Sequence, residues 1–83
     1  MTESTPTPGQ IKRWRQYLAD ERAEASVYRD LAKRRDGEEH AILMALAAAE
    51  GRHEQHWLEL LGPHATPPVR PSIRNQVLGL LAR

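Results

Sequence analysis

The chain has 83 residues, enough for one small domain, and its 12 Lys and Arg residues nearly balance its 11 Asp and Glu residues. A formal net charge of +1 is too balanced to indicate a nucleic acid or an acidic substrate as the partner. The absence of cysteine excludes disulfides, thiolate zinc sites and iron–sulfur clusters, so any metal would be bound by histidine and carboxylate side chains.

Residues 1–9 contain Thr, Ser, Glu and two prolines, with little to bury, and are predicted to be a disordered N-terminal arm. Thr7, Pro8 and Gln10 then have the pattern of a helix start. Threonine stands at the capping position, proline at the first helical position and glutamine at the third. The first helix is therefore predicted from about Pro8 to Arg35.

One face of this predicted helix carries residues at alternating steps of three and four, the spacing that keeps one side against a partner helix. We call this line the first seam, and it consists of Ile11, Trp14, Leu18, Glu21, Ala25, Tyr28 and Ala32. Six of the seven residues suit a hydrophobic core, and Glu21 does not. A carboxylate in this position needs a partner that compensates its charge.

The segment from Arg34 to Gly37 is predicted to end the first helix and to turn the chain. Asp36 is expected to cap a second helix, with Glu39 three residues later completing a capping box. The second helix is predicted from about Gly37 to Leu61, because Gly62-Pro63 is typical of a helix end.

The second helix has a seam of the same kind, which a polar pair interrupts. This second seam consists of Leu43, Leu46, Glu50, His53, Trp57 and Leu60. Glu50 and His53 are three residues apart and therefore share one face of the helix, where they can bind one ion together.

Residues 63–83 are expected to form a proline-rich linker, non-helical from His64 to Pro71, and a short amphipathic C-terminal segment capped by Ser72. An apolar stripe on one face of this segment consists of Ile73, Val77, Leu80 and Leu81. The stripe could pack across a bundle, dock on a shell or lie on a membrane, and the sequence leaves these alternatives open.

The predicted fold class is all-α, with an antiparallel helical hairpin over residues 10–62. Glu21 lies fifteen residues before Asp36, and Glu50 and His53 lie fourteen and seventeen residues after it. At about 1.5 Å per residue, all three reach nearly the same height, roughly 22 Å from the turn. The polar residues of both seams are therefore predicted to meet.

A two-helix hairpin cannot bury its own apolar seam, so we expect two copies to pair into a four-helix bundle. The pair would then hold two Glu21 side chains and two Glu50/His53 pairs. One Glu from each of two helices, with Glu-x-x-His from each of the other two, is the ligand set of di-iron and di-manganese carboxylate bundles. The alternative is a buried salt-bridge cluster that sets the packing register, with four carboxylates for two imidazoles.

The run from Glu21 to Tyr28, followed by Glu50-Gly-Arg-His53, resembles the rubrerythrin branch of the ferritin-like proteins. Within that branch the chain resembles encapsulated ferritins and, more closely, the cytoplasmic ferritin-like domain of vacuolar-iron-transporter-like proteins. The resemblance covers about residues 11–61. It implies that Glu21, Glu50 and His53 are iron ligands, and that Tyr28 hydrogen-bonds near the metals.

Two further side chains are candidates near the ligands. Glu24 and His56 each lie three residues beyond a proposed ligand, at the edge of a seam. Three functional roles are open for each: it coordinates a metal directly, it hydrogen-bonds to a metal ligand, or it binds ions on their way to the site. A plain polar edge is the alternative for both.

We therefore expect iron binding and Fe(II) oxidation at a di-iron site formed between two protomers, serving iron storage or transport. Two iron ions are expected per dimer interface, with Mn or Zn as substitutes. The expected partners are a second copy or a higher homo-oligomer, and a membrane transporter domain or an encapsulating shell, but no nucleic acid. The alternatives are an iron-sensing regulatory domain of a membrane transporter without significant turnover, and a purely structural dimerisation hairpin.

No apolar run approaches the roughly 20 residues that a membrane span needs, and no signal-peptide pattern follows Met1. The chain is therefore expected to be soluble and cytoplasmic. Tethering to a membrane and enclosure in a compartment remain open for its natural context.

Overall fold

The computed structural model describes residues 5–83, which are helical with no strand in this range. The helices are α1 (Pro8–Ala32), α2 (Gly37–Leu61) and α3 (Ile73–Ala82), with a short 3-10 helix η1 (Gly62–Ala65) after α2. The predicted all-α class is confirmed, as are two long helices that pack together and a short C-terminal helix. Residues 1–4 of the predicted N-terminal arm lie outside the described residues.

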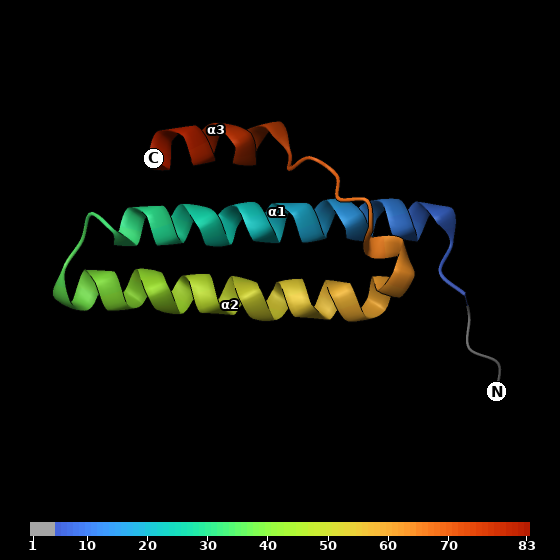
Figure 1. Ribbon diagram of the computed structural model, residues 1–83, viewed down its shortest axis with the longest axis horizontal. Coiled ribbons are helices and arrows are strands. Elements are labelled where there is room, and N and C mark those ends of the chain that lie inside the picture. The colour runs from blue at the N-terminus through green and yellow to red at the C-terminus, as the bar shows by residue number, and fades with distance from the viewer. Residues whose placement is uncertain (1–4) are drawn as a thin grey trace.

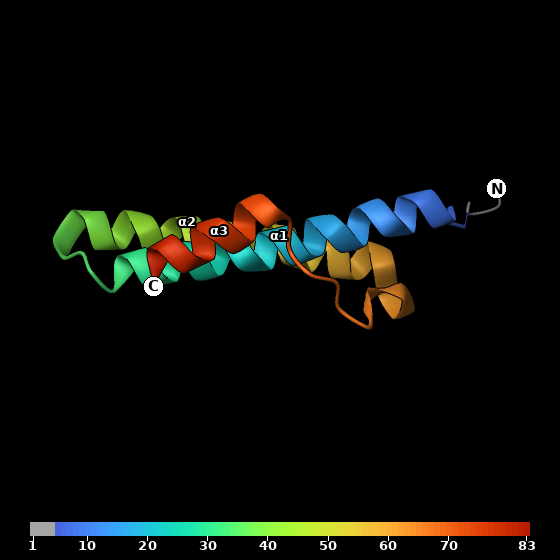
Figure 2. The same cartoon turned by 90° about the horizontal axis from the view of Figure 1, so that it is seen from above.

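The three α-helices lie side by side in one layer, with α1 in the middle (Figure 1). The layer is thin when it is seen from above (Figure 2), and the molecule measures 51 × 27 × 15 Å along its principal axes. Within the described chain, α1 packs against both α2 and α3, whereas α2 and α3 do not come together. A single layer cannot enclose its apolar side chains, because no second layer covers them.

The start of α1 follows its local sequence. The Thr7 side chain accepts a hydrogen bond from the Gln10 backbone, and the Gln10 side chain accepts one from the Thr7 backbone. This capping box confirms the predicted start. The helix ends at Ala32 rather than at Arg35, because the backbone N–H groups of Arg34 and Arg35 bond three residues back in a tight turn.

The predicted capping box at the start of α2 was wrong. Asp36 occupies the capping position with extended backbone, but its side chain makes no capping hydrogen bond. Glu39 instead pairs with Arg35, with 3.2 Å between the charged atoms. The imidazole of His40 reaches across the turn, where its Nδ1 lies 2.7 Å from the carbonyl oxygen of Ala32 at the end of α1.

Within residues 5–83 the buried apolar residues are few, and six of the eight are alanines, which let helices approach closely but bury little area. They are Leu18, Ala19, Ala25, Ala32, Ala47, Leu61, Ala65 and Ala82. The larger side chains gather where the start of α1 meets the end of α2. There Leu18 and Leu61 pack with Trp14 and Trp57.

Every second residue of a seam is seven positions from the last, so each seam consists of two parallel columns of side chains. The two columns of a seam differ in exposure, because the neighbouring helix covers one more than the other. In α1, Leu18, Ala25 and Ala32 are only 1–3% exposed, whereas the column that contains Glu21 is half-buried. In α2, the column that contains Glu50 is half-buried. The other column of α2 is exposed, and we call it the exposed column: Leu46, His53 and Leu60.

Leu61→Ala is expected to destabilise the fold by about 2–5 kcal/mol, the usual cost of truncating a buried leucine. Leu61 is the largest fully buried side chain, at 1% exposure. Chemical denaturation would measure the free energy of unfolding. Leu81→Ala is the control, because Leu81 is 73% exposed and its loss should change stability by no more than about 0.5 kcal/mol. Equal effects of the two substitutions would contradict this packing.

α2 ends at Gly62, whose positive φ of 52° suits glycine, and this confirms the predicted helix end. The linker prediction was wrong at its start, because His64 and Ala65 lie in η1 (Gly62–Ala65), with Pro63 in its first turn, rather than in non-helical chain. Proline is tolerated in the first turn of such a helix, since it lacks only an N–H group that would be unpaired there. Ser72 caps α3 as predicted, accepting a hydrogen bond from the Asn75 backbone.

The apolar stripe of α3 points away from α1. Its four residues are between 49% and 80% exposed, whereas Asn75 and Ala82 on the opposite side of the helix are buried. None of the described helices is both long enough and apolar enough to span a membrane.

Candidate metal centre

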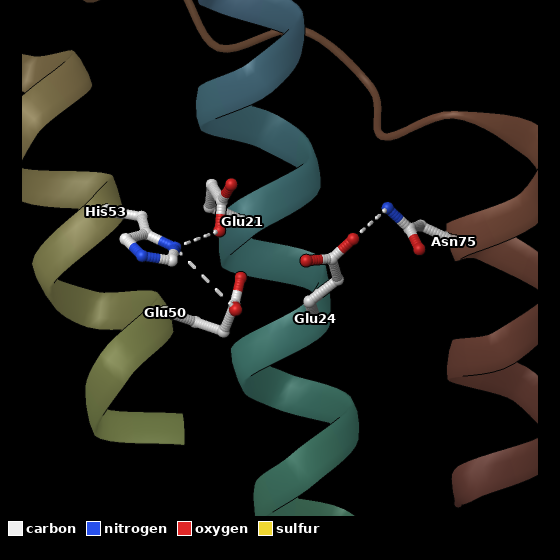
Figure 3. A network of polar contacts seen from close by, with 5 residues as sticks. All are labelled: Glu21, Glu24, Glu50, His53 and Asn75. Atoms are coloured by element: carbon white, nitrogen blue, oxygen red, sulfur yellow. Dashed lines mark hydrogen bonds and ion pairs between the residues drawn. The ribbon is translucent and has the colours of Figure 1, made fainter. Parts of the chain in front are cut away.

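Glu21, Glu50 and His53 meet between α1 and α2, at the height that the residue count predicts (Figure 3). His53 Nδ1 lies 3.2 Å from Glu21 Oε2 and 3.7 Å from Glu50 Oε1. Each of the three side chains offers one ligand atom, and these atoms lie within 4.8 Å of one another. The group is compatible with one metal ion bound by two carboxylates and one imidazole.

The three side chains differ in their exposure to solvent. The side chains of Glu50 and Glu21 are 15% and 21% exposed, whereas that of His53 is 59% exposed. Glu50 Oε2 is buried and has no hydrogen-bond partner among the residues that the structure describes. Burial raises the pKa of Glu50, and the neighbouring Glu21 carboxyl raises it further. A buried carboxylate beside another carboxylate is costly in the apo protein, and a divalent cation would remove that cost.

Glu24 extends the cluster towards α3. Its Oε1 accepts a hydrogen bond of 3.3 Å from Nδ2 of Asn75 (Figure 3). Its second oxygen points towards the side where Glu21 and Glu50 lie (Figure 3). Burial raises the pKa of Glu24, and the contact with Glu50 adds to this rise. Three carboxyl groups therefore share a partly buried space with a single imidazole.

Among the described residues, the ligand group contains none of the three remaining candidates, Glu24, Tyr28 and His56. Tyr28 is half-buried and lines a cavity next to Glu24, with Arg74 and Leu78 of α3 on its far side. His56 is exposed and packs edge-on against Trp57, with 5.0 Å between the ring centroids. Tyr28 is thus near Glu24, whereas His56 lies outside the Glu21–Glu50–His53 group.

Two structural features support the helices on either side of this group. Trp57, one turn beyond His53, packs against Tyr17 and Trp14, at 5.0 and 6.5 Å between ring centroids. Arg22 and Glu54, which follow Glu21 and His53 in sequence, form an ion pair of 2.8 Å between the helices. Contacts on both sides therefore restrict how far α1 and α2 can slide past one another.

The ligand atoms are carboxylate oxygens and an imidazole nitrogen, which suit Fe, Mn or Zn and offer none of the soft sulfur ligands that Cu(I) prefers. Three protein ligands leave a metal coordinatively unsaturated, so further ligands must come from solvent, from Glu24 or from another chain. Because His53 is exposed, that side of the group is accessible from outside the hairpin.

Sequence reasoning missed Asn75 and Asp20. Asn75 is buried at 4% exposure against Glu24, and Asp20 accepts a 2.6 Å hydrogen bond from the backbone N–H of Ser72. Asp20 stands directly before Glu21, and Asn75 lies opposite the apolar stripe of α3. The sequence holds no signal for either role, because nothing local specifies which side of α3 faces α1.

No family model, curated protein or solved structure matches this chain. The resemblance to ferritin-like and rubrerythrin-type proteins therefore stays a prediction from residue spacing.

Proposed function

We propose that the protein binds Fe²⁺ and oxidises it at a site that two copies of the chain form together. The observation that carries this proposal is the meeting of Glu21, Glu50 and His53 from two helices, with their ligand atoms within 4.8 Å. Their carboxylates are partly buried and carry more negative charge than His53 alone can balance. A cation is the simplest partner for such a group.

The exposed column of α2 supports a second copy as the source of the missing ligands. Leu46 and Leu60 are 41% and 42% exposed, and both flank His53 on the same helix face. Tyr17, one turn before Glu21 on α1, is 43% exposed as well. Apolar side chains at seven-residue spacing around polar ligands are typical of a helical interface. A two-fold axis over this face would bring two half-sites together.

In this assembly the residues around the site would have distinct roles. Glu21 and Glu50 would hold Fe²⁺ and compensate the higher charge of Fe³⁺, and His53 would supply the nitrogen ligand. Two Fe²⁺ ions lose one electron each, and O₂ takes up both electrons and two protons to leave as hydrogen peroxide. The aromatic side chains of Trp57 and Tyr17 would exclude water on one side of the site.

Aerobic addition of Fe²⁺ to the purified protein should give oxidation faster than in buffer, with about one ion bound per chain. Glu21→Ala and His53→Ala should each abolish this acceleration, because each removes a ligand. His56→Ala is the matched control, since it removes a histidine one turn away on the same helix. The appearance of Fe³⁺ absorbance measures the rate. Wild-type oxidation at the rate of buffer would overturn the ferroxidase proposal.

Two alternative functions, an iron-sensing domain and a structural hairpin, predict different results for metal binding and Tm. Tight Fe²⁺ binding without oxidation would favour an iron-sensing domain that regulates a transporter. A protein that purifies without metal, and whose Tm does not respond to Fe²⁺, Mn²⁺ or Zn²⁺, would be a structural dimerisation hairpin. The surplus of partly buried carboxyl groups argues against that last alternative, because a purely structural ion pair needs balanced charge.

A further inference from the structure

α3 and the end of the linker before it are attached to α1 by hydrogen bonds near the candidate metal centre. The backbone N–H of Ser72 donates to Asp20, Asn75 donates to Glu24, and the Arg70 carbonyl accepts from Gln16. Asp20 and Glu24 lie on either side of Glu21 in sequence. The third helix is therefore connected to the helix segment that carries a proposed ligand.

Asn75 is the only polar residue among the buried residues of the described chain. Burying a carboxamide is unfavourable unless it is hydrogen-bonded, and the buried Oδ1 atom of Asn75 has no partner in the described part of the chain. An apolar residue at this position would attach α3 with less cost. The one bond that Asn75 makes with its side chain goes to Glu24, so its burial has the effect of orienting that carboxylate.

The orientation of the Glu24 carboxylate determines whether its second oxygen faces the proposed ligands Glu21 and Glu50. Asn75 bonds to Oε1, and the second oxygen of Glu24 is turned back towards α1, on the side where Glu21 and Glu50 lie (Figure 3). The bond from Asn75 and a metal would therefore use different oxygens of the same carboxylate. A residue that hydrogen-bonds to a metal ligand in this way orients the ligand and strengthens metal binding without contacting the metal.

We propose that Asn75 positions Glu24 as a further metal-binding carboxylate, so that the docking of α3 and metal binding strengthen one another. This inference rests on the proposed metal function. It makes α3 part of the metal centre although none of its residues binds the ion. Linkage requires the effect to be mutual: if docked α3 favours the metal, bound metal must favour docked α3 by the same factor.

The test uses the full chain and Mn²⁺, which binds such ligands and whose free concentration is readily followed by electron paramagnetic resonance. Asn75→Ala should weaken Mn²⁺ binding about 10–100-fold, the usual effect of removing a partner behind a ligand. Leu81→Ala, on the exposed stripe of the same helix, should bind as wild type does. Hydrogen exchange of the α3 amides should slow on Mn²⁺ addition in the wild type, but not in Asn75→Ala.

A double-mutant cycle separates positioning from a general effect on α3. Glu24→Gln keeps an acceptor for Asn75 but loses the carboxylate, so adding Asn75→Ala to it should change Mn²⁺ affinity by less than about twofold. A full further loss in the double variant would overturn the inference, because Asn75 would then act by another route. Equal affinity of Asn75→Ala and wild type would overturn it too, and would leave the proposed function standing. A wild-type protein that binds neither Mn²⁺ nor Fe²⁺ would overturn both.

Discussion

Glu50→Gln is expected to lose metal binding and, at the same time, to raise the Tm of the apo protein. The substitution keeps the shape of the side chain but removes the charge. Removing a residue that only hydrogen-bonds to a metal ligand weakens metal affinity roughly 10–100-fold. Glu50 would be a direct ligand, so Glu50→Gln should weaken the affinity by more than this. Titration with Mn²⁺ measures the affinity, and calorimetry of the apo protein measures the Tm.

The gain in stability follows from the direction of the pKa shift. Burial raises the pKa of Glu50 in the folded protein above its ordinary value, so the folded state binds the proton more tightly than the unfolded state. The stability contributed by the protonated form is present in acid and is lost as pH rises through the raised pKa. At neutral pH the ionised group therefore destabilises the fold. Glutamine lacks this penalty, and a gain of a few degrees in Tm is expected.

The same reasoning specifies the control for this prediction. Glu38→Gln removes a carboxylate from an exposed position in the first turn of α2, where negative charge is favourable. It should leave metal affinity unchanged and should not raise the Tm. A Glu50→Gln protein that binds Mn²⁺ as tightly as wild type would exclude Glu50 as a ligand. An unchanged Tm would mean that its burial carries no cost.

Leu46→Lys is expected to break the proposed dimer and, with it, the proposed metal binding, although it alters no proposed ligand. Leu46 belongs to the exposed column of α2, so lysine is easily accommodated in the single chain. In the proposed dimer the lysine charge would be buried, at a cost of several kcal/mol per ion. Each of the two chains contributes one such lysine, so the cost is incurred twice. Since each 1.4 kcal/mol is tenfold in Kd, the dimer should be lost at micromolar concentration.

Analytical ultracentrifugation measures the mass, and Mn²⁺ titration of the same sample measures binding. Leu81→Lys is the matched control, because it places the same charge on the other exposed apolar surface, the stripe of α3. The control should remain a dimer and bind metal. If Leu81→Lys dissociates the protein and Leu46→Lys does not, the copies meet through α3, and the proposed shared site is wrong.

The sequence by itself determined the features that depend on neighbouring residues or on constant helix geometry. The capping box of Thr7 and Gln10, the turn at Gly62 and the cap at Ser72 all rely on groups no more than a few residues apart. The meeting of Glu21 with Glu50 and His53 was also predictable. The rise per residue is constant along a helix, so counting from the turn places side chains at matching heights.

Only the tertiary structure decided which side of each helix is covered. The column of Leu18 is buried and that of Leu46 is exposed, although both belong to seams with the same spacing, because α1 and α2 each have only one side against the other. The docking of α3 through the side that carries Asn75, rather than through its apolar stripe, includes a contact with Glu24 some fifty residues away. At Asp36 the expected side-chain cap is absent, although Asp36 occupies the capping position. Glu39 pairs with Arg35 there, and His40 lies against the carbonyl oxygen of Ala32. The covered side of each helix is set by contacts between residues far apart in the chain, and no local pattern encodes these contacts.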